Sequence, residues 1–158
     1  MAHAIVRLDK LQAVYAGNLE SVDIEKDLDN GSHVVVGGLA GMGGEVVVGS
    51  APADVENEEV LLVATPELMY DERLDLEDFY NPVGVPARAY HYTIGDIVTI
   101  TDDGIDGATV VGEYVVPQNG SERLIASDER GTTRFAGLVI AKENLHGKPA
   151  TVYRVVGC

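Results

Sequence analysis

Cysteine, tryptophan and long apolar runs are scarce or absent in this chain of 158 residues. The single cysteine, Cys158, is the last residue, and one thiol cannot form a disulfide within the chain. No apolar run approaches the roughly 18 residues that a membrane-spanning helix needs. Residues 1–10 (MAHAIVRLDK) lack the apolar region and cleavage site of a secretory signal peptide. We therefore expect synthesis in a reducing compartment and no membrane partner.

Positive charge is also scarce. The chain has 11 Lys and Arg against 26 Asp and Glu, which gives a formal net charge of −15. This excess argues against nonspecific binding to nucleic acid or to an anionic membrane, because both carry negatively charged phosphates. It is compatible with a basic partner surface or with a cation. Hydrophobic residues make up 46% of the chain, which is enough for a folded core.

Helix signals are few, and short β-type runs separated by Gly, Asn and Asp dominate the sequence. This spacing predicts an all-β fold, a compact sandwich or barrel, with a loop-rich segment and an extended N-terminal arm. The run at 60–64 (VLLVA) is apolar throughout, so we expect it to be buried on both sides. The runs are 4–8, 13–15, 33–36, 45–48, 60–64, 97–101, 110–116, 123–125, 135–141 and 151–156.

The length suits one domain, which we divide into two parts. Residues 1–30 are expected to form an N-terminal arm or edge strands, and residues 31–158 a main β domain with a loop-rich insertion near 66–92. Within that insertion, 71–79 (DERLDLEDF) is the best helix candidate, although prolines bracket it. The glycine-rich segment 37–44 joins two valine-rich runs, which predicts a hairpin with a long loop.

Several patterns suggest chemical sites, but each lacks something that the chemistry needs. The glycines of 37–44 are not followed by the Lys-Ser/Thr of a phosphate-binding loop. The acidic run at 102–107 lacks the ligand spacing of a calcium loop. The four histidines are scattered and only one cysteine is present, which disfavours a zinc site. No serine lies in a Gly-x-Ser-x-Gly motif. We predict no catalytic residue, no cofactor and no metal site.

The tyrosines are the best candidates for function. Four of the seven lie between residues 69 and 92, and such amphipathic rings suit contact with another protein. The alternative is that these rings pack in the core or across strands. Exposure of Tyr70, Phe79 and Tyr80 distinguishes the two interpretations. Together with apolar residues near the N-terminus, the predicted partner-binding residues are Ile5, Val6, Leu8, Tyr15, Tyr70, Phe79, Tyr80 and Tyr90.

Four blocks of the sequence resemble a known family. They are 66–73 (PELMYDER), 86–90 (PARAY), 95–101 (GDIVTIT) and 138–156 (LVIAKENLHGKPATVYRVV). The chain is similar, over most of its length, to capsid decoration (cement) proteins of tailed bacteriophages. The resemblance implies a noncatalytic structural protein, made in the host cytoplasm, that binds the outer face of the major capsid protein lattice and bridges its subunits. It also implies a homo-oligomer on the exterior of the virion.

Two other functions remain open from the sequence. The first is another virion component, such as a head-fibre base, a tail tube or a baseplate protein. Purified tail-tube subunits would polymerise, which tests that alternative. The second is a carbohydrate-binding module or hydrolase built on a β-sandwich. Glycan binding that a tyrosine substitution abolishes, or hydrolase activity, would support it.

Overall fold

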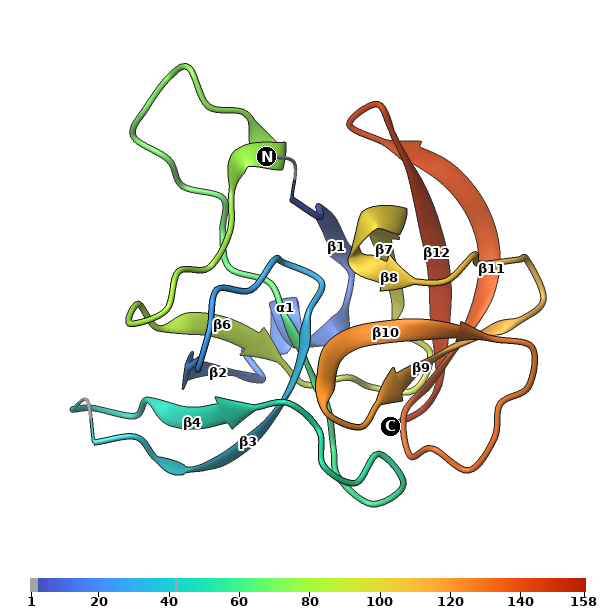
Figure 1. Cartoon of the computed structure of the whole chain (residues 1–158), viewed down its shortest axis with the longest axis horizontal. Coiled ribbons are helices and arrows are strands. Elements are labelled where there is room, and N and C mark those ends of the chain that lie inside the picture. Colours follow the sequence, from blue (N-terminus) through green and yellow to red (C-terminus); the bar gives the residue numbers. More distant parts are fainter. Residues whose placement is uncertain (1–2, 42) are drawn as a thin grey trace.

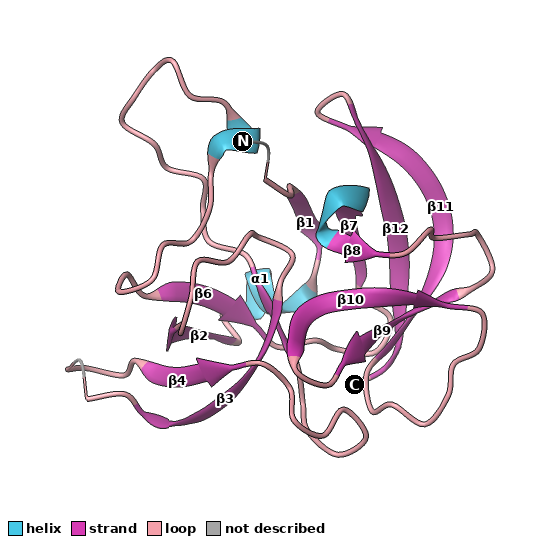
Figure 2. Ribbon diagram, in the orientation of Figure 1, coloured by secondary structure: helices cyan, strands magenta, loops and turns pink. Residues whose placement is uncertain are grey.

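The computed structural model describes residues 3–41 and 43–158 of the chain. Strands make up 45% of the structure and helices 7%, which confirms the predicted all-β fold. The strands form two units, a closed five-stranded barrel and a seven-stranded sheet. Figure 1 shows the barrel on the left and the larger sheet on the right, and Figure 2 shows how little helix the structure contains.

The seven-stranded sheet is built around one long hairpin, β11 and β12 (Figure 1). Its neighbouring strands are antiparallel except for the short β8, which runs parallel to β10. Strand β1 lies at one edge and pairs with β7. In spatial order the strands are β1 (Val6–Lys10), β7 (Ile97–Thr101), β12 (Lys148–Gly157), β11 (Ala136–Leu145), β9 (Tyr114–Gln118), β10 (Ser121–Ser127) and β8 (Ile105–Asp106).

The barrel closes because β2 pairs on one side with β4, in parallel, and on the other side with β6, antiparallel. The predicted glycine-loop hairpin is confirmed by the antiparallel pairing of β3 with β4. Closure removes the free strand edges that an open sheet would have. In order around the barrel the strands are β2 (Leu19–Asp23), β4 (Val47–Ser50), β3 (His33–Leu39), β5 (Leu61–Val63) and β6 (Ala87–Tyr90).

Three short helical segments complete the chain: α1 (Gln12–Ala16), η1 (Leu76–Asp78) and η2 (Asp102–Gly104). The prediction of a strand at 13–15 is wrong, because this segment forms the turn α1, which Gly17 ends with a left-handed φ of 73°. The helix predicted at 71–79 shrinks to the single 3-10 turn η1. No helix among the described residues is long and apolar enough to cross a membrane.

Most of the predicted strands are present, with altered ends. The run at 110–116 is an exception, since its strand begins only at Tyr114 and the preceding Val110 and Val111 are exposed. Of the first thirty residues, β1 joins the larger sheet and β2 joins the barrel. The N-terminal part therefore contributes one strand to each of the two units.

Strand β5 is buried on both faces, as predicted, because it separates two hydrophobic cores. Leu61 and Val63 point into the core of the barrel, together with Val22 and Val34. Leu62 points the other way, into a core that includes side chains of the seven-stranded sheet. The alternation of side chains along a strand explains why this three-residue segment has no polar position.

A chain of buried aromatic groups connects the two sheets. Nε2 of His33, on β3, lies 2.6 Å from the Tyr92 hydroxyl. That hydroxyl lies 2.6 Å from the hydroxyl of Tyr153, on β12. Phe135 packs against both tyrosines, with its ring centroid 4.6 Å from Tyr92 and edge-to-face to Tyr153. Burial raises the pKa of both tyrosines, so the phenols stay neutral and hydrogen-bonded.

The pH dependence of folding tests the burial of His33. Burial lowers the pKa of His33 from 6.5 to about 3. Between these values the unfolded chain binds a proton that the folded chain does not. The contribution to the free energy of unfolding is therefore complete above pH 6.5, and it falls by up to about 1.4 kcal/mol per pH unit as the pH drops toward 3. In His33→Gln this fall should be absent in urea unfolding between pH 6.5 and 4.

Tyr92→Phe is the control, because it removes a hydrogen bond to His33 but keeps the imidazole. It should be less stable than wild type at every pH and keep the wild-type slope. Equal slopes for wild type and His33→Gln would contradict the burial of a neutral imidazole.

Packing of Tyr153 against the backbone of β11 gives a second prediction. A Cβ atom at Gly137 would lie 2.6 Å from Cδ2 of Tyr153, whose ring is fully buried and hydrogen-bonded. Gly137→Ala should therefore lower the free energy of unfolding by about 1–3 kcal/mol. Gly38→Ala is the matched control, since a Cβ there meets no atom within 4 Å, and it should change stability by less than about 0.5 kcal/mol. Equal stability of the two variants would contradict this packing.

Candidate functional site

Exposed apolar side chains gather on the segment that joins β5 to β6. We call residues 65–86 the tyrosine loop; Figure 1 shows it rising above the barrel at the upper left. It carries seven of the 15 large exposed hydrophobic residues found among the described residues. They are Leu68, Tyr70, Leu74, Leu76, Tyr80, Val83 and Val85. Exposed apolar groups in a folded protein are typical of contact sites, so the tyrosine loop is the candidate functional site.

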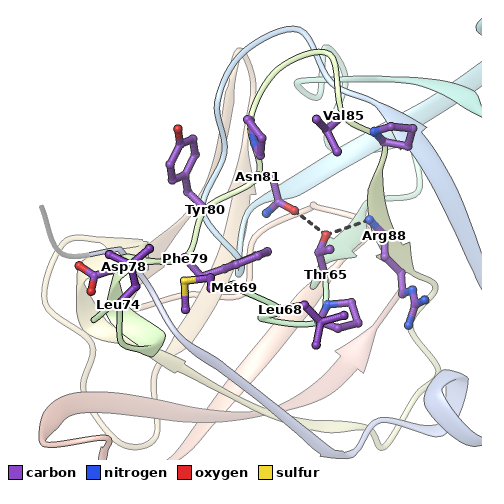
Figure 3. Close-up of a pocket in the computed structure, with 13 residues that line it drawn as sticks. Thr65, Leu68, Met69, Leu74, Asp78, Phe79, Tyr80, Asn81, Val85 and Arg88 are labelled. Atoms are coloured by element: carbon purple, nitrogen blue, oxygen red, sulfur yellow. Dashed lines mark hydrogen bonds between the residues drawn. The ribbon is translucent and has the colours of Figure 1, made fainter. Parts of the chain in front are cut away.

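A groove of about 570 Å³ lies within this loop (Figure 3). Most of its lining is apolar, and Arg88, on β6, lies at one end. Figure 3 shows Met69 and Phe79 on one side and Val85 on the other. The lining residues are Thr65, Pro66, Leu68, Met69, Leu74, Asp78, Phe79, Tyr80, Asn81, Pro82, Val85, Pro86 and Arg88.

Two buried asparagines hold the base of the tyrosine loop. Asn30 donates to the Thr65 carbonyl (2.8 Å) and accepts from the Thr65 amide (3.0 Å). Asn81 donates to Leu28 O (3.1 Å) and to Asn30 Oδ1 (3.0 Å), and it accepts from the Thr65 hydroxyl. That hydroxyl also accepts from the Arg88 amide (Figure 3). Both ends of the loop are thus attached to the turn that contains Asn30.

Two histidines hold the outer part of the loop. The ring of His3 stacks on Tyr80, with centroids 5.0 Å apart, and its backbone amide donates to Glu77 O. His146, at the tip of the β11–β12 hairpin, contacts Asp75, with Nε2 and Oδ1 3.0 Å apart. The amide of Leu76 and the His146 ring hold the pKa of Asp75 below its ordinary value. The η1 turn is therefore fixed from two directions.

The tyrosine loop is strongly acidic around its apolar groups. It has six acidic residues and one basic residue, Arg73, which gives a net charge of −5. Arg73 pairs with Asp71, with Nη2 and Oδ2 2.8 Å apart. The other acidic residues are Glu67, Glu72, Asp75, Glu77 and Asp78. An apolar groove in an acidic surface favours a ligand that is both apolar and cationic.

The structure separates the predicted partner-binding residues into different environments. Tyr70 is fully exposed and Tyr80 is 39% exposed, whereas Phe79 is partly buried as a wall of the groove. Tyr15 is exposed on α1, outside the tyrosine loop. Tyr90 is 5% exposed and belongs to the core between the sheets. The prediction of Tyr90 as an exposed contact ring is therefore corrected, although the residue lines a hollow beside β1.

The N-terminal candidates are also mostly interior. Ile5 is 4% exposed and lies just before β1, where its backbone amide and carbonyl are hydrogen-bonded to Thr101 at the end of β7, so its prediction as a contact residue is corrected. Val6 and Leu8 are half-buried against the core between the sheets. A deletion of residues 1–16 would remove β1 and the buried Leu11, so it would disturb folding as well as any contact.

Sequence reasoning missed the apolar residues of the loop that are not aromatic, and both asparagines. Leu68, Leu74, Val83 and Val85 lie in no β-type run, and they stand among prolines and acidic residues. Apolar residues that fit neither a strand nor a helix pattern were the available signal for an exposed patch. Asn30 and Asn81 are 51 positions apart, and no local pattern marks them as partners.

Two other clusters of polar side chains are weaker candidates for a functional site, because their charged groups pair with one another. His91 lies between two carboxylates, with Nε2 3.0 Å from Glu20 and Nδ1 3.2 Å from Glu59. Lys142, on β11, pairs with Asp102 of η2, with Nζ and Oδ2 2.7 Å apart. Among residues 3–41 and 43–158, no group of three or more His, Cys, Asp or Glu side chains is placed to hold a metal ion.

Comparisons with known proteins find no protein family, no curated protein and no solved structure that matches this chain. The tyrosine loop, its groove and the charge around them are thus the features of the molecule that bear on function.

Replacement of Asn81 tests the base of the loop. Asn81→Ala would remove three side-chain hydrogen bonds at a buried site, those with Leu28 O, Asn30 Oδ1 and the Thr65 hydroxyl, although each of these groups keeps one other hydrogen bond. The variant should therefore lower the free energy of unfolding by about 1–3 kcal/mol in urea unfolding. Amide hydrogen exchange in 65–86 should also become faster. The exposed Asn144→Ala is the control and should change neither. Wild-type stability and exchange in Asn81→Ala would show that the network does not hold the loop.

Proposed function

We propose that this protein is a noncatalytic structural protein of a tailed phage, which binds the outer surface of the capsid and stabilises it by bridging capsid subunits. The single observation that carries the proposal is the concentration of exposed apolar side chains on the tyrosine loop. The sequence resemblance to capsid decoration proteins suggests the partner. It also suggests the place of action, the virion exterior.

The exposed groups are sufficient for a contact of moderate strength. Burial of apolar surface contributes roughly 25 cal/mol per Å². A specific interface buries about 1,200–2,000 Å² in total, and a few aromatic residues near its centre provide most of the affinity. Tyr80 fits that role because it lines the groove and is 39% exposed, and Tyr70, which follows the groove residue Met69 in the sequence, is fully exposed. On a capsid, the same contact is repeated at every equivalent site.

The fixed base of the tyrosine loop supports the same function. Binding normally costs free energy because loops and side chains lose conformational freedom. Here Asn30, Asn81, His3 and His146 already restrain the loop in the free protein. The loop can therefore contact a partner with a smaller loss of entropy. Such a preorganised surface suits a protein whose task is adhesion.

Bridging requires a second contact face. Helix α1 offers one, because Val14 is 39% exposed and Tyr15 is 76% exposed. The Tyr15 hydroxyl donates to the carbonyl of Asp9, which fixes the ring against the end of β1. We assign the tyrosine loop to one capsid subunit and α1 to its neighbour.

Binding to undecorated phage heads tests the proposal. Tyr70→Ala combined with Tyr80→Ala should weaken the apparent Kd by at least about tenfold, since truncation of aromatic contact residues costs about 1–2 kcal/mol or more each. Occupancy is measured by sedimentation of heads and imaging. Leu39→Ala, at an exposed apolar residue outside the tyrosine loop, should bind as wild type does. Failure of the wild-type protein to bind heads, or full occupancy by the double variant, would contradict the proposal.

A further inference from the structure

We propose that the groove of the tyrosine loop receives an extended segment of the partner, in which a bulky apolar side chain is flanked by Lys or Arg. This inference rests on the proposed function and names the chemistry of the partner segment. Three features of the structure support the inference: the shape of two neighbouring hollows, the charge of the tyrosine loop and the position of β1 at the edge of its sheet.

The groove is suited to an apolar side chain. Its volume of about 570 Å³ falls within the range of roughly 300–1,000 Å³ that small ligands occupy in proteins. Met69, Phe79 and Val85 line it, and they leave apolar surface in contact with water. A bulky apolar side chain placed there would remove this surface from water.

The charge around the groove selects among possible occupants. The tyrosine loop carries a net charge of −5 and the whole chain −15. A second copy of this chain would bring the same excess of negative charge to the contact and would be repelled. A segment with Lys or Arg beside its apolar residue would instead meet the carboxylates of Asp78 in the groove and Glu67 in the hollow next to it, away from the basic lining residues Arg88 and Arg7. The exposed Glu72 of the tyrosine loop adds to the same negative charge.

A second hollow lies beside the groove, at the edge of the larger sheet. It has a volume of about 390 Å³, shares Thr65 and Pro66 with the groove and is also lined by Val6, Arg7, Leu8 and Asp9 of β1. Side chains alternate between the two faces of a strand. Four consecutive lining residues therefore place the edge of β1, and not one face, toward the hollow.

Strand β1 is the edge strand of its sheet, with β7 on the other side. The carbonyls of Leu8 and Asp9 already accept from the Leu11 amide and the Tyr15 hydroxyl, so an added strand would pair with the remaining backbone groups of β1. A free strand edge presents backbone donors and acceptors to an additional strand, and many proteins bind extended peptides in this way. A partner segment that pairs with β1 would pass Pro66 and enter the groove. The two hollows thus define one path for an extended chain.

Photochemical cross-linking on undecorated heads tests this assignment. Cys158 is the only cysteine, so Cys158→Ser with Val83→Cys gives one thiol beside the groove that can carry a benzophenone label. Cys158→Ser with Leu39→Cys is the control at a distant exposed site. After irradiation, mass spectrometry should find the Val83→Cys label on one capsid segment that contains a bulky apolar residue flanked by Lys or Arg. The control label should not react with that segment.

Two further measurements separate the parts of the proposal. Glu67→Lys with Glu72→Lys should weaken head binding at least tenfold in low salt and flatten its salt dependence, whereas the exposed pair Asp128→Lys and Glu129→Lys should not. Amide hydrogen exchange within residues 6–10 should slow at least tenfold in the complex.

The outcomes distinguish this inference from the proposed function. If the wild-type protein does not bind heads, the proposed function fails, and the inference fails with it. If heads are fully occupied but the Val83→Cys label reacts with a second copy of this chain, an acidic segment or nothing, only the inference is overturned. Unchanged exchange at 6–10 would overturn the pairing with β1.

Discussion

The packing of the barrel against the seven-stranded sheet is the interaction on which the rest of the structure depends. Apolar side chains from both units form one core, and the hydrogen-bonded chain of His33, Tyr92 and Tyr153 crosses it. A buried polar group without a partner costs about 1–3 kcal/mol, so these hydrogen bonds favour one alignment of the barrel and the sheet over others. Since β5 is part of both cores, the barrel cannot shift without opening both.

The tyrosine loop depends on this alignment. It leaves the barrel at β5 and returns at β6, and two buried asparagines fix its ends. The loop can then expose apolar side chains without collapsing onto the core, because its base is held by hydrogen bonds. Its six acidic residues surround the apolar surface, so the 22 positions 65–86 carry both the apolar groups and the charge on which the proposed binding relies.

The fold class was predictable because short β-branched runs separated by turn residues are compatible with few folds other than an all-β sandwich or barrel. The burial of Leu61–Val63 on both faces and the hairpin of β3 and β4 followed from the local order of apolar residues and glycines. The turn α1 was not predictable, because its five residues are held by tertiary packing of Ala13 and by the left-handed Gly17, and not by helix propensity. The parallel pairing that closes the barrel, β2 with β4, joins segments that no local pattern relates.

The sequence by itself determined that the chain is an acidic, all-β protein and that the region around Tyr70 and Tyr80 is a loop rich in aromatic residues. Only the tertiary structure decided which of the candidate residues reach solvent. Tyr90 and Tyr70 are the same residue type, yet one is buried in the core between the sheets and the other is exposed. The physical reason is that burial is set by what packs against a side chain, and those neighbours come from distant strands.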